Sequence, residues 1–144
     1  GQQTTPTIAG PGNVTYVAVD ATGKIYVTNS AANTLTTYKA DGTPTTPTIT
    51  AGLDGPGDVV VDAAGKIYVA NGGGKGTITT YNADGSRAKP TIAVKGPHGL
   101  AVAADGNIYV TNSANSTVEV FQRNGTPSTP AISGLNTPTG IAVL

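Results

Sequence analysis

The 144-residue chain has no cysteine, methionine or tryptophan, and only 11% of its residues are charged. Without cysteine it forms no disulfide and offers no thiolate nucleophile and no cysteine-bound zinc. Lysine and arginine together number 8, as do aspartate and glutamate. The sequence has neither the basic stripe of a nucleic-acid binder nor a polybasic cluster for a membrane surface. No apolar run is long enough to span a membrane.

Helical periodicity is also missing, because no stretch places apolar residues at i, i+3, i+4 and i+7 over several turns. The chain carries an internal repeat instead. The run Ile-Tyr-Val-Thr-Asn at residues 25–29 recurs in related form at 67–71 and 108–112. Each copy has one β-branched run before it and two after it, separated by Gly, Asp, Asn and Pro. Four strands in about 41 residues make one β-propeller blade.

The repeat predicts an all-β, single-domain β-propeller chain of three four-stranded antiparallel blades. The blades are expected at about residues 10–52, 55–94 and 96–134 of the domain 1–144. An extra outer strand is expected at the N-terminus, residues 4–9, because Pro6 to Ile8 repeat the Pro-x-Ile pattern of the outer strands. An inner strand is expected at the C-terminus, residues 138–143, which match the first strand of a blade.

Aromatic residues support this reading, because six of the seven fall at two positions of the repeat. Those in the second strand are Tyr26, Tyr68 and Tyr109, and those in the third are Tyr38, Tyr81 and Phe121. Ile, Tyr and Val are consecutive in the second strand, so both faces of each sheet carry apolar groups. A sheet with one solvated face would alternate instead. We therefore expect each blade to pack between two neighbours, with the aromatic rings filling the space between blades.

The acidic residues are interpreted as parts of turns. Asp41-Gly42 and Asp84-Gly85 separate the third and fourth strands, and Asp-Gly suits turns that need a positive φ. The alternative is a calcium site, but calcium requires six or more oxygen ligands and the sequence has no acidic cluster. We expect no metal and no cofactor.

Three blades are too few for a closed ring, which normally uses four to eight. Unpaired strand edges are templates for another chain. Two copies could close a six-bladed ring, copies could add into an open filament, or the chain could be half of a longer propeller. We favour self-assembly with other copies. The expected assembly edges are Pro6, Thr7, Ile8, Ile141, Ala142 and Val143.

The blades resemble those of NHL-type propellers and of the Tyr-Val-Thr-Asn repeat proteins. The resemblance rests on the Tyr-Val-Thr-Asn runs at 26–29 and 109–112, and on the Pro-x-Gly-hydrophobic-Ala-Val openings at 97–102 and 138–143. It covers nearly the whole chain. It implies an extracellular, cell-surface or envelope location and recognition of a protein or glycan. It does not identify a function, since one fold hosts many.

One candidate ligand site follows from the resemblance. His98, the only histidine, precedes an inner strand, where propellers open their central channel. Asn13, Asp58 and Thr139 occupy related positions, so a glycan or peptide held by these four residues is an alternative function. The chain also resembles streptogramin lyases, propeller enzymes that use His with Glu and magnesium. Glu119, the only glutamate, lies in mid-strand, and we name no catalytic residue. The leading hypothesis is a non-enzymatic structural module.

Overall fold

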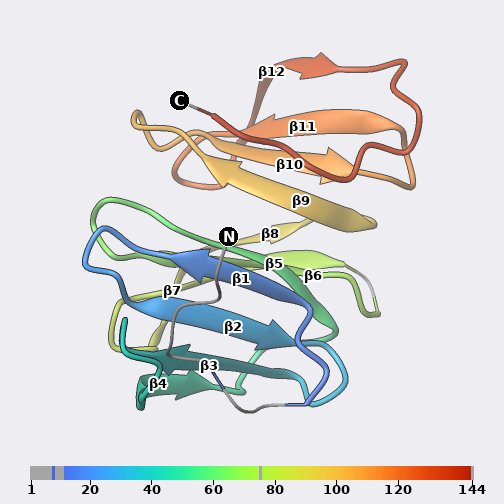
Figure 1. Cartoon of the computed structure of the whole chain (residues 1–144). Helices are drawn as coiled ribbons and strands as arrows, with labels where there is room; N and C mark the ends of the chain where they lie inside the picture. The colour runs from blue at the N-terminus through green and yellow to red at the C-terminus, as the bar shows by residue number, and fades with distance from the viewer. Residues whose placement is uncertain (1–7, 9–11, 75, 144) are drawn as a thin grey trace, which may run out of the picture.

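The computed structural model describes residues 8, 12–74 and 76–143, which form three four-stranded antiparallel sheets (Figure 1). The first sheet contains β1 (Tyr16–Val19), β2 (Ile25–Asn29), β3 (Thr34–Tyr38) and β4 (Pro44–Ile49). The second contains β5 (Pro56–Val61), β6 (Ile67–Asn71), β7 (Thr77–Tyr81) and β8 (Arg87–Ala93). The third contains β9 (Pro97–Val102), β10 (Ile108–Asn112), β11 (Thr117–Phe121) and β12 (Pro127–Ile132). The predicted fold class is confirmed. Within the described part of the chain, no helix could cross a membrane.

Each sheet is one blade, in which the strands follow one another in chain order. The second and third strands pair without interruption in all three blades, as from Ile67↔Tyr81 to Asn71↔Thr77. Successive blades meet through their inner strands, since β5 contacts both β1 and β9. The second blade therefore lies between the other two (Figure 1).

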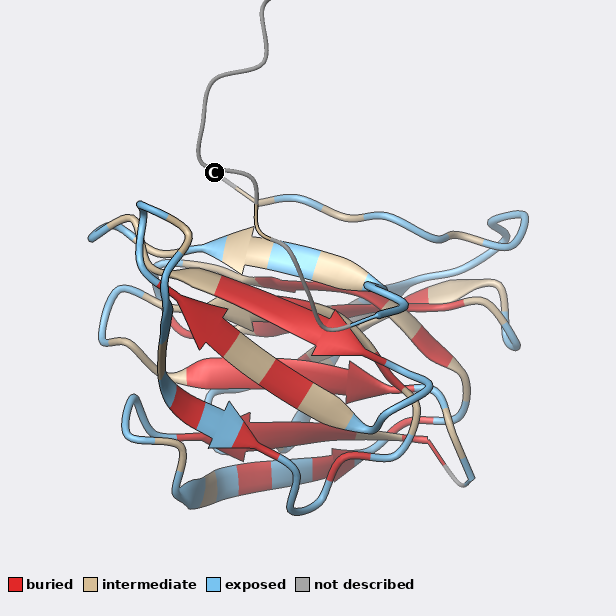
Figure 2. Ribbon diagram, turned by 60° about the horizontal axis from the view of Figure 1, so that its bottom comes forward, coloured by how far each residue is buried: buried red, intermediate tan, exposed pale blue. Residues whose placement is uncertain are grey.

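The core consists of two apolar clusters, one at each junction between blades. The first junction is formed by Tyr26, Leu35, Ile49 and Leu53 of the first blade with Val59, Ile67, Val69 and Tyr81 of the second. The second is formed by Tyr68, Ala70, Ile78, Ile92 and Val94 of the second blade with Leu100, Ile108, Val110 and Phe121 of the third. The buried residues lie mainly in the strands and the exposed ones in the turns (Figure 2). The aromatic residues thus fill the space between blades, as the repeat predicts.

The buried second-strand tyrosines each reach an aspartate in the turn before their strand. The Tyr26 hydroxyl donates to Asp20 Oδ2 at 2.9 Å, and the Tyr68 hydroxyl donates to Asp62 Oδ2 at 3.2 Å. Burial, together with the neighbouring carboxylate, raises the pKa of each tyrosine to about 12. The turn aspartates therefore satisfy a buried hydroxyl as well as the turn backbone. The third blade has Ala103 at this turn position, and its Tyr109 is only half-buried.

The predicted terminal strands have different outcomes. Of the N-terminal strand 4–9, only Ile8 is described; it is half-buried and not in a strand, and Pro6 and Thr7 lie outside the described residues. The prediction of a strand at 138–143 is wrong, because this segment has irregular backbone. In each blade the inner strand is hydrogen-bonded to a second strand. No such partner for 138–143 is present among the described residues, so no ladder forms.

Candidate site at the channel mouth

A small hollow opens where the inner strands of the three blades begin. Its volume is about 170 Å³, and Tyr16 of β1, Gly57 of β5 and His98 of β9 are among the residues that line it. Because the inner strands lie side by side, equivalent positions from successive blades meet at this end of the inner strands. Polar side chains far apart in the sequence are brought together here.

His98 is held by two neighbours through one ring nitrogen. Its Nδ1 lies 3.1 Å from the Thr139 carbonyl oxygen and 3.4 Å from the Tyr16 hydroxyl. The Tyr16 and His98 rings meet edge to face, with centroids 6.2 Å apart. A carbonyl only accepts, so the contact with Thr139 assigns the proton to Nδ1 and makes Nε2 the acceptor nitrogen of the neutral ring. The half-buried imidazole can therefore accept a hydrogen bond from a ligand.

Asp58 connects the second and third blades in the first half of their inner strands, β5 and β9. Its Oδ2 accepts a hydrogen bond from Leu100 N at 2.8 Å, and its Oδ1 accepts one from Val59 N at 2.9 Å. Burial raises the pKa of Asp58, and the two backbone hydrogen bonds and the attraction of a protonated His98 only partly oppose this. The carboxylate thus joins two inner strands at some cost in desolvation.

The raised pKa of Asp58 gives a testable pH dependence. The folded chain holds this proton more tightly than the unfolded chain, so ionisation of Asp58 favours unfolding. We expect Asp58→Asn, which keeps an acceptor for Leu100 N, to increase the free energy of unfolding at pH 7. The gain should disappear as the pH falls below the ordinary carboxyl pKa of 3.8. Urea unfolding of both proteins at pH 3.5 and pH 7 measures the difference.

Asp84→Asn is the matched control, because its effect should have the opposite sign. Hydrogen bonds from the Ser86 side chain and backbone lower the pKa of Asp84 in its exposed turn. That carboxylate stabilises the fold above its unfolded pKa, and the contribution is lost as the pH falls. The control variant should therefore be less stable than the natural chain at pH 7. Equal effects of the two substitutions would contradict the assignment for Asp58.

The structure brings together three of the four residues proposed from the sequence. His98 contacts Thr139, and Asp58 is hydrogen-bonded to Leu100, two residues after His98 on β9. Asn13 is exposed, and of the four residues only His98 lines the hollow itself. Glu119 accepts a hydrogen bond from Asn112 Nδ2 at 2.7 Å and is not a lining residue either. The residue that sequence reasoning missed is Tyr16, although it is the one aromatic outside the two repeat positions.

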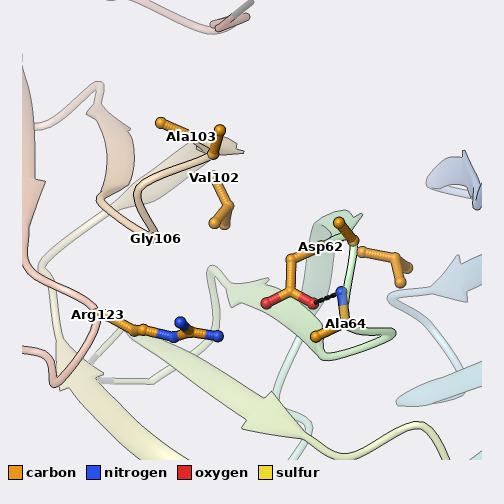
Figure 3. Close-up of a pocket in the computed structure, with 9 residues that line it drawn as sticks. Asp62, Ala64, Val102, Ala103, Gly106 and Arg123 are labelled. Carbon is orange, nitrogen blue, oxygen red and sulfur yellow. Dashed lines mark hydrogen bonds between the residues drawn. The ribbon is translucent and has the colours of Figure 1, made fainter.

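A second hollow lies between the second and third blades, beside the turns that join their inner and second strands. Its volume is about 280 Å³, and it is lined by Asp62 and Val61 on one side and by Arg123 and Val102 on the other (Figure 3). The Asp62 carboxylate is already engaged, since it accepts from Ala64 N and from the Tyr68 hydroxyl. This hollow is therefore lined by apolar side chains from both blades, with an acidic residue on one side and a basic residue on the other.

Sequence and structure together define the class of protein by its β-propeller blades, one of which contains a match to the NHL repeat. Residues 95–121, which contain β9, β10 and β11, match the NHL repeat. The match covers the first three strands of the third blade, and the other two blades have the same strand order. No curated protein sequence matches the chain significantly.

Solved structures with the same fold include both enzymes and a protein complex. The nidogen/laminin complex has 21% identity and a TM-score of 0.82, covering 100% of this chain and 57% of that chain. A streptogramin B lyase has 17% identity and a TM-score of 0.76, and the match covers 90% of this chain and 44% of the lyase chain. A gluconolactonase from Xanthomonas campestris has 20% identity and a TM-score of 0.72, and the match covers 90% of this chain and 52% of the gluconolactonase chain. The chain spans about half the length of these structures. Identities this low establish the fold alone.

Proposed function

We propose that the chain is a non-enzymatic structural module, extracellular or at the cell surface, that assembles with other copies of itself. The observation that carries this proposal is an exposed apolar sheet face on each end blade. Val19 of the first blade is 62% exposed and Ile132 of the third is 52% exposed. At the outer-strand positions equivalent to Ile132 in the first two blades, Ile49 and Ile92 are only 3% and 5% exposed. Val61 and Val102, the inner-strand residues equivalent to Val19, are half-buried.

The exposed apolar surface and the composition both support this proposal. Exposed contiguous apolar surface marks an interaction site in soluble proteins. With 11% charged residues and a formal net charge of zero, the chain has little electrostatic repulsion between copies. An extracellular or cell-surface location follows from the NHL-type resemblance and is part of the proposal.

The expected result for the natural chain is a mass that rises with concentration. Burial of two apolar faces should produce assemblies of at least twice 14.2 kDa between about 1 and 100 µM. Sedimentation velocity or light scattering over this range measures the change. The double variant Val19→Lys/Ile132→Lys should remain a monomer, because each lysine would have to enter an apolar interface. A natural chain that stays at 14.2 kDa throughout would contradict the proposal.

A further inference from the structure

The two junctions within the chain are built in the same way. We call the face of a blade that points toward the preceding blade its N-side face, and the opposite face its C-side face. At the first junction the C-side face carries Tyr26, Leu35 and Ile49. At the second junction Tyr68, Ile78 and Ile92 occupy the same register positions. A blade therefore presents a tyrosine, an aliphatic residue and an isoleucine to the blade that follows it.

The N-side faces are equally regular. The second blade packs Val59, Val61 and Ile67 against the first, and the third packs Leu100, Val102 and Ile108 against the second. These residues are equivalent because each set pairs in the same register: Val61 with Ile67, and Val102 with Ile108. A junction is thus a C-side face packed on the N-side face of the next blade.

Each end blade keeps one face of this kind. The N-side face of the first blade carries Val17, Val19 and Ile25, with the same pairing of Val19 to Ile25, and both valines are exposed. The C-side face of the third blade carries Tyr109, Val118 and Ile132, in the register of Tyr68, Ile78 and Ile92. Leu135 beside it is exposed as well. On this face of the third blade Ile132 is exposed, Tyr109 is half-buried and Val118 is buried. The chain therefore carries the residues of both halves of a junction that it already forms twice.

We infer that the C-side face of the third blade docks on the N-side face of the first blade of a second copy. The inference rests on the proposed self-assembly and adds the two surfaces and their direction. The contact is heterologous, since different faces meet, and two such contacts close a ring or repeated contacts extend a filament. In either arrangement Ile132 of one copy takes the place that Ile49 and Ile92 have within the chain.

The C-terminal segment 138–143 already occupies part of this surface. The Thr111 hydroxyl donates to the Thr139 carbonyl at 3.4 Å, as the Thr28 hydroxyl donates to the Gly57 carbonyl at 2.7 Å at the first junction. Ile141 and Val143 share a hollow with Leu100 and Val60 of the neighbouring inner strands. The segment thus lies where the inner strand of a following blade belongs. In the docked arrangement β1 of the second copy occupies the same position as this segment, so docking displaces the segment.

The test uses two single variants that each disable one face. Val19→Lys leaves the C-side face of the third blade intact, and Ile132→Lys leaves the N-side face of the first blade intact. Each variant alone should associate roughly a hundredfold more weakly than the natural chain. An equimolar mixture should form a dimer of one copy of each and nothing larger, because the second contact would join two disabled faces. Sedimentation of both proteins and of the mixture measures this.

Controls separate the two proposals. Ala63→Lys, in an exposed turn of the second blade, should associate like the natural chain. Circular dichroism checks that every variant is folded. If the natural chain associates but the mixture gives no dimer, the head-to-tail contact is wrong while self-assembly stands. If the natural chain is a monomer, both are wrong, and the open faces belong to blades of another polypeptide or of a longer chain.

A second measurement uses the absence of cysteine in the chain. Val19→Cys and Ile132→Cys place one thiol on each of the two faces. A short bis-maleimide should link the two variants to each other in a mixture, with a yield well above that of either variant alone. Equal yields in the mixture and in the separate variants would overturn the head-to-tail contact.

Discussion

Tyr68→Ala is expected to destabilise the fold by about 3–5 kcal/mol, enough to unfold many domains of this size. Tyr68 is fully buried at the junction of the second and third blades. Its removal would leave a cavity between two sheets and would take away the donor to Asp62. Chemical denaturation followed by circular dichroism measures the loss.

Two matched variants divide this effect into its parts. Tyr68→Phe removes only the hydroxyl and should cost about 1 kcal/mol. Tyr109→Ala changes the same repeat position in the third blade, where the ring is only half-buried, and should cost clearly less than Tyr68→Ala. Equal losses at positions 68 and 109 would mean that packing between blades does not determine the stability. The comparison is best made at a concentration where the chain is monomeric, because association would cover Tyr109.

Gly85→Ala is expected to be the second severe change, with a loss of about 2–4 kcal/mol. Gly85 has a φ of +86° in the turn between β7 and β8, which L-residues adopt at a cost. A Cβ on Gly85 would also lie 2.5 Å from the Pro47 Cβ of the preceding blade. The substitution therefore strains the turn and pushes two blades apart. Thermal and urea unfolding measure the loss.

Gly134→Ala isolates the backbone contribution. Gly134 has a φ of +76°, but a Cβ there would have no atom within 4 Å. Its replacement should cost about 1–2 kcal/mol, from the positive φ alone. A loss at Gly134 as large as that at Gly85 would show that contact between the turn and Pro47 contributes nothing.

The blades could be predicted from the sequence because their signals are local and repeated. The Ile-Tyr-Val runs identify the second strand of each blade, and Asp-Gly pairs such as Asp84-Gly85 identify turns whose glycine has a positive φ. The different burial of Tyr68 and Tyr109 could not be predicted from the repeat, since the two tyrosines have the same local pattern. The burial of these tyrosines depends on whether another blade packs on theirs, and the local pattern does not contain this information.

The structures of the C-terminal segment and of the site around His98 also depend on contacts that a local sequence pattern does not contain. Residues 138–143 match an inner strand in sequence, but a strand also needs a hydrogen-bonded partner. The sequence predicts that Asp58, His98 and Thr139 lie near one another because the starts of successive inner strands meet in a propeller. Asn13 was grouped with them by the same reasoning, yet it precedes β1 in an exposed stretch. The contact of Tyr16 with His98 joins residues 82 positions apart, and no local pattern indicates it.

The position of the second blade between two others has a consequence for how the molecule opens. Apart from the contact of Tyr16 in the first blade with His98 in the third, the blades pack mainly on their neighbours, so the free energy of the chain approximates a sum of blade and junction contributions, as in a linear array. Each end blade is held by one junction and the central blade by two. Fraying should therefore begin in β1–β4 or β9–β12, and the amides of β6 and β7 should exchange their hydrogens last. A further blade packed on an end blade would slow hydrogen exchange in that end blade without any change in its sequence.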